Sequence, residues 1–200
     1  MYHLAKSHFK KHDPILYRAA QRHTVPNVKR SRDVFRDLVH AVTNQQLSGK
    51  AADTIFGRLE TLVGKRGISP KTLLTLHTPS FRKCGFSEAK AKTIRALAQA
   101  IVDGKLDLVS IHKHQDPLIM DILTSVKGIG PWTAEMILMF SLGRTDIFSK
   151  GDLGLRKGIM RLYSLRGMPT DRQIEKLSRA WTPYRTYAAR VLWRVADEEK

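Results

Sequence analysis

Apolar residues recur at helical spacing along most of the chain. Val34, Leu38, Ala41 and Val42 lie three and four positions apart, and the same spacing returns in the segment 94–101. This periodicity places apolar side chains on one face of an α-helix. No sustained alternation of apolar and polar residues, the pattern of a half-buried strand, interrupts it. The pattern therefore predicts an all-α protein of about ten short helices joined by tight turns.

Capping residues indicate where these helices begin. A side-chain oxygen before a helix satisfies a free amide of the first turn, and a proline at the first position has no amide to satisfy. Five such pairs occur: Asp13-Pro14, Ser69-Pro70, Thr78-Pro79, Asp116-Pro117 and Thr182-Pro183. Further N-caps are expected at Ser31, Ser48, Ser87 and Thr170.

One segment is apolar on nearly every helical face, and it follows a glycine-rich turn. The segment 132–140 predicts a buried helix in the middle of the fold, with Pro131 as its first residue. The preceding turn, Lys127-Gly128-Ile129-Gly130, leaves backbone amides uncovered at a helix start. Free amides and the positive end of the helix dipole favour a bound phosphate there. We expect a phosphate-binding turn beside the boundary between two lobes.

A carboxylate follows this helix at a distance that allows it to return to the turn. The helix is roughly 16–18 Å long at about 1.5 Å per residue. The segment 143–151 spans up to about 30 Å when extended, so Asp152 can reach the turn that carries Trp132. Asp152 alone is also explained as a simple N-cap. The two roles are compatible, because a capping carboxylate stays ionised and can stabilise positive charge on a sugar.

Aromatic and amide side chains near this turn have two interpretations. Trp132 follows the polar turn and could stack on a base, which contributes about 1–3 kcal/mol, or it could fill the core. For Trp181 we favour the core. Gln45 and Gln46 stand where one helix ends, at a corner that is either merely exposed or able to contact DNA.

The high net positive charge of the chain indicates what class of partner it binds. The chain of 200 residues has 35 basic and 18 acidic residues, a net charge of +17, spread over nearly every segment. A folded domain this basic most often binds a polyanion, although a merely soluble basic protein has the same composition.

The only cysteine, Cys84, excludes an internal disulfide and a cysteine-ligated zinc or iron–sulfur site. No membrane-length apolar run or secretory signal is present, so we expect a cytoplasmic, nucleoid-associated protein, or a nuclear one in a eukaryote.

Two motifs together resemble a known family. The sequence Val-Lys-Gly-Ile-Gly-Pro-Trp-Thr-Ala at 126–134, followed by Asp-Leu-Gly-Leu at 152–155, resembles the helix-hairpin-helix (HhH-GPD) DNA glycosylase superfamily. Within it the chain is similar to the alkylbase branch, the 3-methyladenine DNA glycosylases of the second type. Further matches lie at 45–52, 85–90 and 181–188.

The resemblance implies a two-lobed all-α fold that forms a single HhH-GPD unit over residues 1–200. Residues 31–130 would form a helical barrel that includes the hairpin. Residues 1–30 and 131–200 would form a discontinuous second lobe, with the active-site cleft between the lobes.

The resemblance also assigns roles to individual residues. Asp152 takes the position of the catalytic aspartate. Residues expected to contact the excised base are Trp132, Trp193, Met136 and Tyr184. Residues expected to contact DNA are Gln45, Gln46, Ser48, Lys127, Gly128, Gly130 and Thr133, with Gln46 at the position of the wedge inserted into the duplex. Backbone carbonyls of Thr124, Val126 and Ile129 would hold a sodium or potassium ion, and no other cofactor is expected.

The position of Trp132 bears on the type of reaction. Family members that also cut the DNA strand have a nucleophilic lysine there, and tryptophan cannot form a Schiff base. The iron–sulfur cysteines of some relatives are missing as well. We therefore expect a monofunctional glycosylase of base excision repair. It would flip alkylated purines of the 3-methyladenine and 7-methylguanine type out of double-stranded DNA and hydrolyse their N-glycosidic bond, acting as a monomer.

Two other functions are compatible with parts of the sequence. A non-catalytic helix-hairpin-helix protein that binds DNA or damage would share the fold and the charge. An oxidised-purine or mismatch glycosylase with lyase activity is disfavoured by Trp132 and by the cysteine count.

Overall fold

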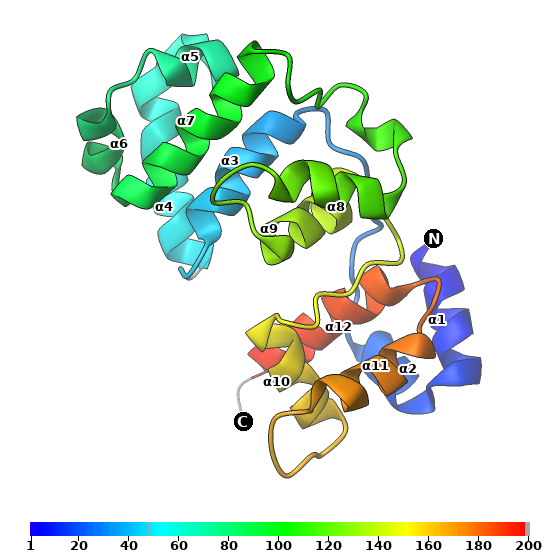
Figure 1. Cartoon of the computed structure of the whole chain (residues 1–200). Coiled ribbons are helices and arrows are strands. Elements are labelled where there is room, and N and C mark those ends of the chain that lie inside the picture. The colour runs from blue at the N-terminus through cyan, green and yellow to red at the C-terminus, as the bar shows by residue number, and fades with distance from the viewer. Residues whose placement is uncertain (48, 199–200) are drawn as a thin grey trace. The chain divides into compact units, whose positions relative to one another are not determined.

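The computed structural model describes residues 1–47 and 49–198, and every regular element within them is helical. Twelve α-helices are present in this part of the chain, somewhat more than the sequence predicts, and the all-α prediction is confirmed (Figure 1). The chain divides into two compact units, one formed by Met1–Arg30 with Gly143–Lys200 and the other by Ser31–Leu142. The N-terminal segment therefore folds with the C-terminal third of the chain.

The unit Ser31–Leu142 is built around helix α3 (Val34–Asn44), whose apolar face is buried. Helices α4 (Gly49–Val63), α7 (Glu88–Val102) and α9 (Pro131–Met136) pack against α3. The remaining elements are η1 (Gly64–Arg66), α5 (Pro70–Leu74), α6 (Thr78–Cys84), η2 (Ile111–Lys113), α8 (Asp116–Thr124) and η3 (Ile137–Ser141). Helices α8 and α9 form the helix-hairpin-helix (Figure 1).

The second boundary between the units differs from the one expected after residue 130. Helix α9 packs on α8 and α3, and η3, a π-helical turn that continues α9, packs on α3 as well. Ala134, Leu138 and Met139 are buried in this unit, as their apolar pattern predicts. The whole segment from Pro131 to Leu142 therefore belongs to the unit that carries the hairpin, and the boundary follows Leu142.

The discontinuous unit contains α1 (Tyr2–His12), α2 (Pro14–Arg22), α10 (Leu153–Leu162), α11 (Asp171–Arg179) and α12 (Arg185–Asp197). Helix α12 packs on both α10 and α2 (Figure 1). Helices α10 and α12 approach closely at Gly158, where an added Cβ would lie 2.3 Å from the carbonyl oxygen of Leu192. Only glycine fits at that contact.

The predicted N-caps are partly confirmed. Side chains of Asp13, Ser69, Ser87 and Thr170 accept backbone amides at helix starts. The predictions at Thr78, Asp116 and Ser31 are wrong, because the N-caps there are His77, Gln115 and Asp33. The prediction at Thr182-Pro183 is also wrong: this peptide bond is cis, and α12 begins later, at Arg185. Ser48 lies outside the described residues.

A buried carboxylate joins α1, α2 and the C-terminal segment. Asp13 caps α2 and accepts hydrogen bonds from Trp181 Nε1, at 2.8 Å, and from the hydroxyl of Tyr163. Trp181 is fully buried, which confirms its predicted core role. Burial, followed by the adjacent Asp13 charge, raises the pKa of the Tyr163 phenol far above its usual range.

Cys84 is buried as well, which agrees with a core role. Within residues 1–47 and 49–198 no helix has the length and apolar character needed to span a membrane.

Candidate active site

Asp152 caps helix α10 and receives two hydrogen bonds on one oxygen. Its Oδ1 accepts the backbone amide of Leu155 at 2.8 Å and the indole Nε1–H of Trp193 at 2.9 Å. The residue is half-buried. A carboxylate that accepts two N–H donors at a helix N-terminus is held in one orientation. The N-cap interpretation is therefore confirmed, and it leaves a fixed carboxylate that is suited to electrostatic stabilisation.

Two glycines on α10 allow Trp193 to reach this carboxylate. At Gly154 an added Cβ would lie 2.9 Å from Cδ1 of Trp193 and 3.1 Å from Asp152 Oδ1. One turn further, Gly158 allows the backbone of α12 to approach. Small residues four positions apart lie on one helix face and permit close packing. This Gly-x-x-x-Gly spacing is the signal from which the contact could have been found in the sequence.

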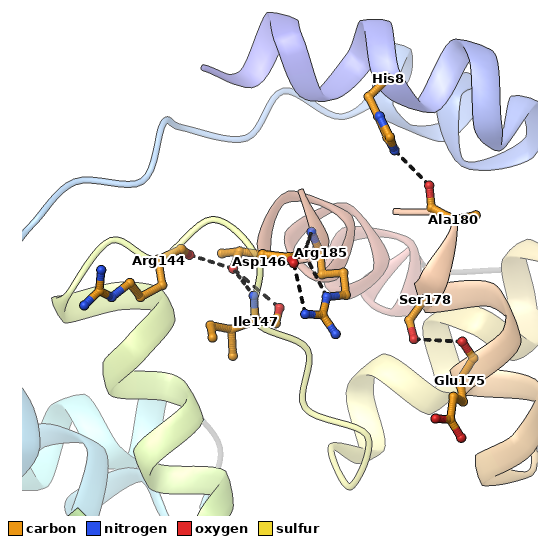
Figure 2. Close-up of polar contacts among 9 residues, drawn as sticks. His8, Arg144, Asp146, Ile147, Glu175, Ser178, Ala180 and Arg185 are labelled. Atoms are coloured by element: carbon orange, nitrogen blue, oxygen red, sulfur yellow. Dashed lines mark hydrogen bonds and ion pairs between the residues drawn. The ribbon is translucent and has the colours of Figure 1, made fainter. Parts of the chain in front are cut away.

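Hydrogen bonds and an ion pair connect the loop before Asp152 to the start of α12. Asp146 binds the guanidinium of Arg185 through both carboxylate oxygens, at 2.8 and 3.0 Å. The hydroxyl of Thr186 accepts the Ile147 amide at 3.0 Å and donates to the carbonyl of Arg144 at 2.7 Å. Figure 2 shows Arg144, Asp146 and Ile147 gathered at Arg185. A paired, bidentate contact of this kind restricts the loop just before the carboxylate.

Tyr184, predicted to contact the base, lies in an aromatic cluster. Its ring is edge-on to His8 of α1, with centroids 5.5 Å apart, and 6.4 Å from the ring of Tyr187. His8 also forms a hydrogen bond with the carbonyl of Ala180 at 2.9 Å (Figure 2). These contacts give Tyr184 a packing role beside α1, and none of them joins it to Asp152 or Trp193. Its role in base binding stays a prediction.

The hairpin turn in the other unit needs glycine at one position. Gly128 has a φ of +93°, and a Cβ there would lie 1.9 Å from Oγ1 of Thr93. Gly130 has no atom within 4 Å of its potential Cβ. Among the hydrogen bonds between described residues, the amides of Gly128 and Gly130 donate none. Both are exposed or half-buried, so they are available to an anion.

Gln45 connects the end of α3 to this turn. Its side-chain amide donates to the Gly128 carbonyl at 3.1 Å and to Oγ1 of Thr133 at 2.9 Å. Thr133 is buried, so its side chain faces the protein instead of solvent. Of the residues predicted to contact DNA, Lys127 and Gln46 are exposed, and Gln46 adopts the left-handed φ of +56°. An exposed tip with this rare backbone conformation is compatible with a wedge, which stays a prediction.

The carbonyls predicted to hold a cation lie on the same hairpin. The Val126 oxygen accepts the Ile129 amide at 3.0 Å and retains a second lone pair. Within the described residues, the backbone hydrogen bonds of the turn do not use the oxygens of Thr124 and Ile129. Neutral carbonyl oxygens are suitable ligands for a monovalent cation. The donor set therefore fits sodium or potassium, and no group of three or more His, Cys, Asp or Glu within residues 1–47 and 49–198 could hold another metal.

A pocket of about 280 Å³ lies in this unit between α3 and α9 with η3. It contains two of the residues predicted to contact the base, Trp132 and Met136. The other lining residues are Asp37, His40, Ala41, Asn44, Ile137, Phe140 and Ser141. Its volume is at the lower end of the range for small-molecule pockets. The polar side chains of Asp37, His40 and Asn44 were not predicted, because on α3 they read as the polar face of an amphipathic helix.

The described contacts thus bring the predicted residues together in groups. Asp152 joins Trp193 on the discontinuous unit, and Trp132 joins Met136 in the pocket. Gln45, Gly128 and Thr133 meet at the hairpin. A capped carboxylate, an exposed glycine turn and a pocket with an aromatic wall, on a basic all-α chain, are the features expected of a base-excision DNA glycosylase.

The chain belongs to the HhH-GPD superfamily of base excision DNA repair proteins, whose family model matches residues 39–183. It is 34% identical over 170 residues to DNA-3-methyladenine glycosylase 1 of Schizosaccharomyces pombe, covering 82% of this chain and 73% of that protein. The solved structure of S. pombe 3-methyladenine DNA glycosylase in complex with abasic DNA matches with a TM-score of 0.89 and 31% identity, over 98% of this chain and 99% of that one. A DNA-3-methyladenine glycosidase from Bacillus halodurans matches with a TM-score of 0.80 and 34% identity, over 96% and 88%.

Proposed function

We propose that this protein is a monofunctional DNA glycosylase that releases alkylated purines, of the 3-methyladenine and 7-methylguanine type, from double-stranded DNA. The observation that carries the proposal is the fixed carboxylate of Asp152, held by Leu155 N–H and Trp193 Nε1–H. The similarity to 3-methyladenine DNA glycosylases supports the class of substrate.

The chemistry starts from a base that is already activated. Methylation at N3 or N7 of a purine places a positive charge on the base and weakens its glycosidic bond. The target nucleotide first rotates out of the duplex at a cost of a few kcal/mol. When the C1′–N bond breaks, its electron pair stays with the base, which leaves neutral, and the sugar becomes an oxocarbenium-like cation. Asp152 stabilises this cation electrostatically and orients a water molecule. The water adds to C1′ and gives up one proton, to the Asp152 carboxylate or to solvent, which leaves an abasic site.

Trp132 supports hydrolysis rather than strand cleavage. It stands where lyase-active relatives have a nucleophilic lysine, and it lines the pocket together with Met136. Its ring offers an aromatic face to a cationic base, an interaction of up to about 2 kcal/mol in a desolvated site. No amine at this position can form a Schiff base with the sugar.

The hairpin is proposed to grip the DNA backbone. The amides of Gly128 and Gly130 donate to no described residue and are available to a phosphate. Lys127 adds an exposed positive charge, and the chain has a net charge of +17. A monovalent cation held by the carbonyls of Thr124, Val126 and Ile129 would stabilise the turn and attract a phosphate. We further propose that the protein acts as a monomer on duplex DNA.

Chromatography of bases released from methylated duplex DNA, together with borohydride trapping, tests the proposal. The expected result is free 3-methyladenine or 7-methylguanine, an alkali-labile abasic site and no covalent adduct. DNA binding without release of any base would support the non-catalytic alternative. A trapped protein–DNA adduct would support the lyase alternative.

A further inference from the structure

A buried oxygen without a partner lies on a residue of the Trp132 pocket. Asn44, the last residue of α3, lines this pocket. Its side-chain Oδ1 is buried and has no hydrogen-bond partner among the described residues. Buried polar atoms in native proteins are nearly always hydrogen-bonded, and exceptions cluster at functional sites. An acceptor left without a donor beside a pocket is best explained by a donor that arrives with a ligand.

The neighbouring contacts hold Asn44 in this position. Lys90 donates from Nζ to the carbonyl of Thr43 at 2.8 Å, and Gln45 bonds to Gly128 and Thr133 of the hairpin. Burial lowers the pKa of the Lys90 ammonium. The residues on both sides of Asn44 are therefore anchored. Burying the unpaired oxygen of Asn44 in this position costs stability.

The rest of the pocket favours a ligand that is cationic and donates hydrogen bonds. The carboxylate of Asp37 lines the pocket, and the hydrogen bonds and ion pairs of the described residues include none to its side chain. His40 also lines the pocket, but its side chain already has a partner, since its Nε2 lies 3.0 Å from Asp53 Oδ1. Trp132 and Met136 supply the apolar walls. An acceptor, a negative charge and an aromatic face are complementary to a flat, positively charged ring with N–H groups.

We propose that Asn44 is a specificity-determining residue whose Oδ1 accepts a hydrogen bond from an N–H group of the flipped-out alkylated purine. This inference rests on the proposed function for the identity of the ligand. 3-Methyladenine offers its exocyclic N6 amine, and 7-methylguanine offers N1–H and its N2 amine. In 1,N6-ethenoadenine the added ring consumes these donors. The pocket therefore discriminates against the etheno base, because Oδ1 stays unpaired when that base is bound.

Binding of free bases tests the inference apart from catalysis. Free 3-methyladenine and free 1,N6-ethenoadenine are titrated into the full chain, with quenching of tryptophan fluorescence as the readout. Asn44→Leu keeps the approximate size and removes the acceptor, whereas Asn44→Asp keeps an acceptor and cannot donate. We expect Asn44→Leu to weaken 3-methyladenine binding roughly tenfold and to leave ethenoadenine binding unchanged or stronger. Asn44→Asp should bind 3-methyladenine at least as well as wild type.

Thermal unfolding provides the structural control. Because no intramolecular hydrogen bond to Oδ1 is lost, Asn44→Leu should melt at or above the wild-type temperature, by up to about 2–4 °C. Equal weakening of both bases by Asn44→Leu, or no effect on either, overturns the inference. Loss of 3-methyladenine binding in Asn44→Asp also overturns it, since that variant retains the acceptor.

Base release from methylated DNA separates the two hypotheses. If wild type releases bases while Asn44→Leu binds 3-methyladenine normally, the inference fails and the proposed function stands. If Asn44 controls binding of the free base and no base is released from DNA, the proposed function fails and the binding inference stands.

Discussion

Oδ1 of Asp152 accepts the indole Nε1–H of Trp193 at 2.9 Å, and the same oxygen accepts the amide of Leu155. The first bond joins α12 to the start of α10, so the position of the carboxylate depends on tertiary packing as well as on a local cap. The resemblance to the family suggested that Trp193 stacks on a base. The structure gives it a second and better-defined role, as the residue that orients the carboxylate.

Trp193→Phe separates these two roles. Phenylalanine keeps an aromatic face and loses the N–H donor, so the carboxylate loses one of the two bonds that hold it. We expect kcat for base release to fall about tenfold while KM changes little, because a hydrogen bond to a charged group contributes roughly 1.5–3 kcal/mol. Steady-state kinetics on a defined lesion duplex measures both. A rise in KM with kcat unchanged would favour the stacking role alone.

Gly154→Ala should disturb the same contact sterically. The added Cβ would lie 2.9 Å from Cδ1 of Trp193, closer than real contacts allow, and 3.1 Å from Asp152 Oδ1, tighter than most contacts. We expect a loss of about 1–3 kcal/mol in the free energy of unfolding and a larger proportional loss of activity. Gly167→Ala is the matched control, since nothing lies within 4 Å of its potential Cβ. Urea unfolding of both variants checks the result, and equal stability of the two would contradict the close packing.

Gly128→Ala should impair DNA binding more than Gly130→Ala does. Gly128 combines a φ of +93° with a potential Cβ 1.9 Å from Thr93 Oγ1, whereas Gly130 has open space. Alanine at 128 must move the turn, and the amides proposed to bind the phosphate move with it. We expect at least about tenfold weaker binding of undamaged duplex for Gly128→Ala, and less than about threefold for Gly130→Ala. Fluorescence anisotropy at fixed salt measures both, and the reverse order would show that the turn geometry is unimportant.

Stability should depend on the ionisation of Tyr2 at high pH. Its hydroxyl donates to the carbonyls of Ala20 and His23, and burial raises the pKa of the phenol to about 12 from an ordinary 10. The unfolded chain loses this proton first. The stabilisation that the protonated Tyr2 hydroxyl gives to the folded chain is therefore complete below pH 10 and is lost as pH rises toward 12.

Comparison with Tyr2→Phe isolates this effect from other titrating groups. The variant should melt below wild type at neutral pH, because it lacks the two hydrogen bonds. The difference in melting temperature should shrink between pH 10 and 12. A difference that stays constant across this window would mean that the phenol ionises equally in the folded and unfolded chain.

Local signals predicted the helical fold well and its tertiary details less well. Asp13, Ser69, Ser87 and Thr170 act as caps because capping depends on residues adjacent in the chain. The resemblance placed the unit boundary after residue 130, whereas the packing of α9 against α3 and α8 places it after Leu142. Helix α12 likewise begins at Arg185, two residues after the helix start that Thr182-Pro183 predicts.

The candidate site shows the same division between local and long-range information. Asp152 and the glycine turn were found from motifs that are continuous in sequence. The bond from Trp193 to Asp152 joins residues 41 positions apart, and Gln45 reaches Thr133 across 88 positions. Asn44 gave no signal, because a polar residue at a helix end reads as ordinary solvent exposure. Its significance depends on a buried oxygen without a partner, which only the three-dimensional structure reveals.

The most direct test of the central claim is single-turnover release of 3-methyladenine from methylated duplex DNA by wild type and by Asp152→Asn. Asparagine preserves the size of the side chain and an oxygen for the bonds from Leu155 and Trp193, and it removes the negative charge. If the charge stabilises the oxocarbenium-like sugar, the rate of base release should fall at least about a hundredfold while DNA binding stays within about threefold. Release by Asp152→Asn at the wild-type rate would contradict the assignment of Asp152 as the catalytic carboxylate.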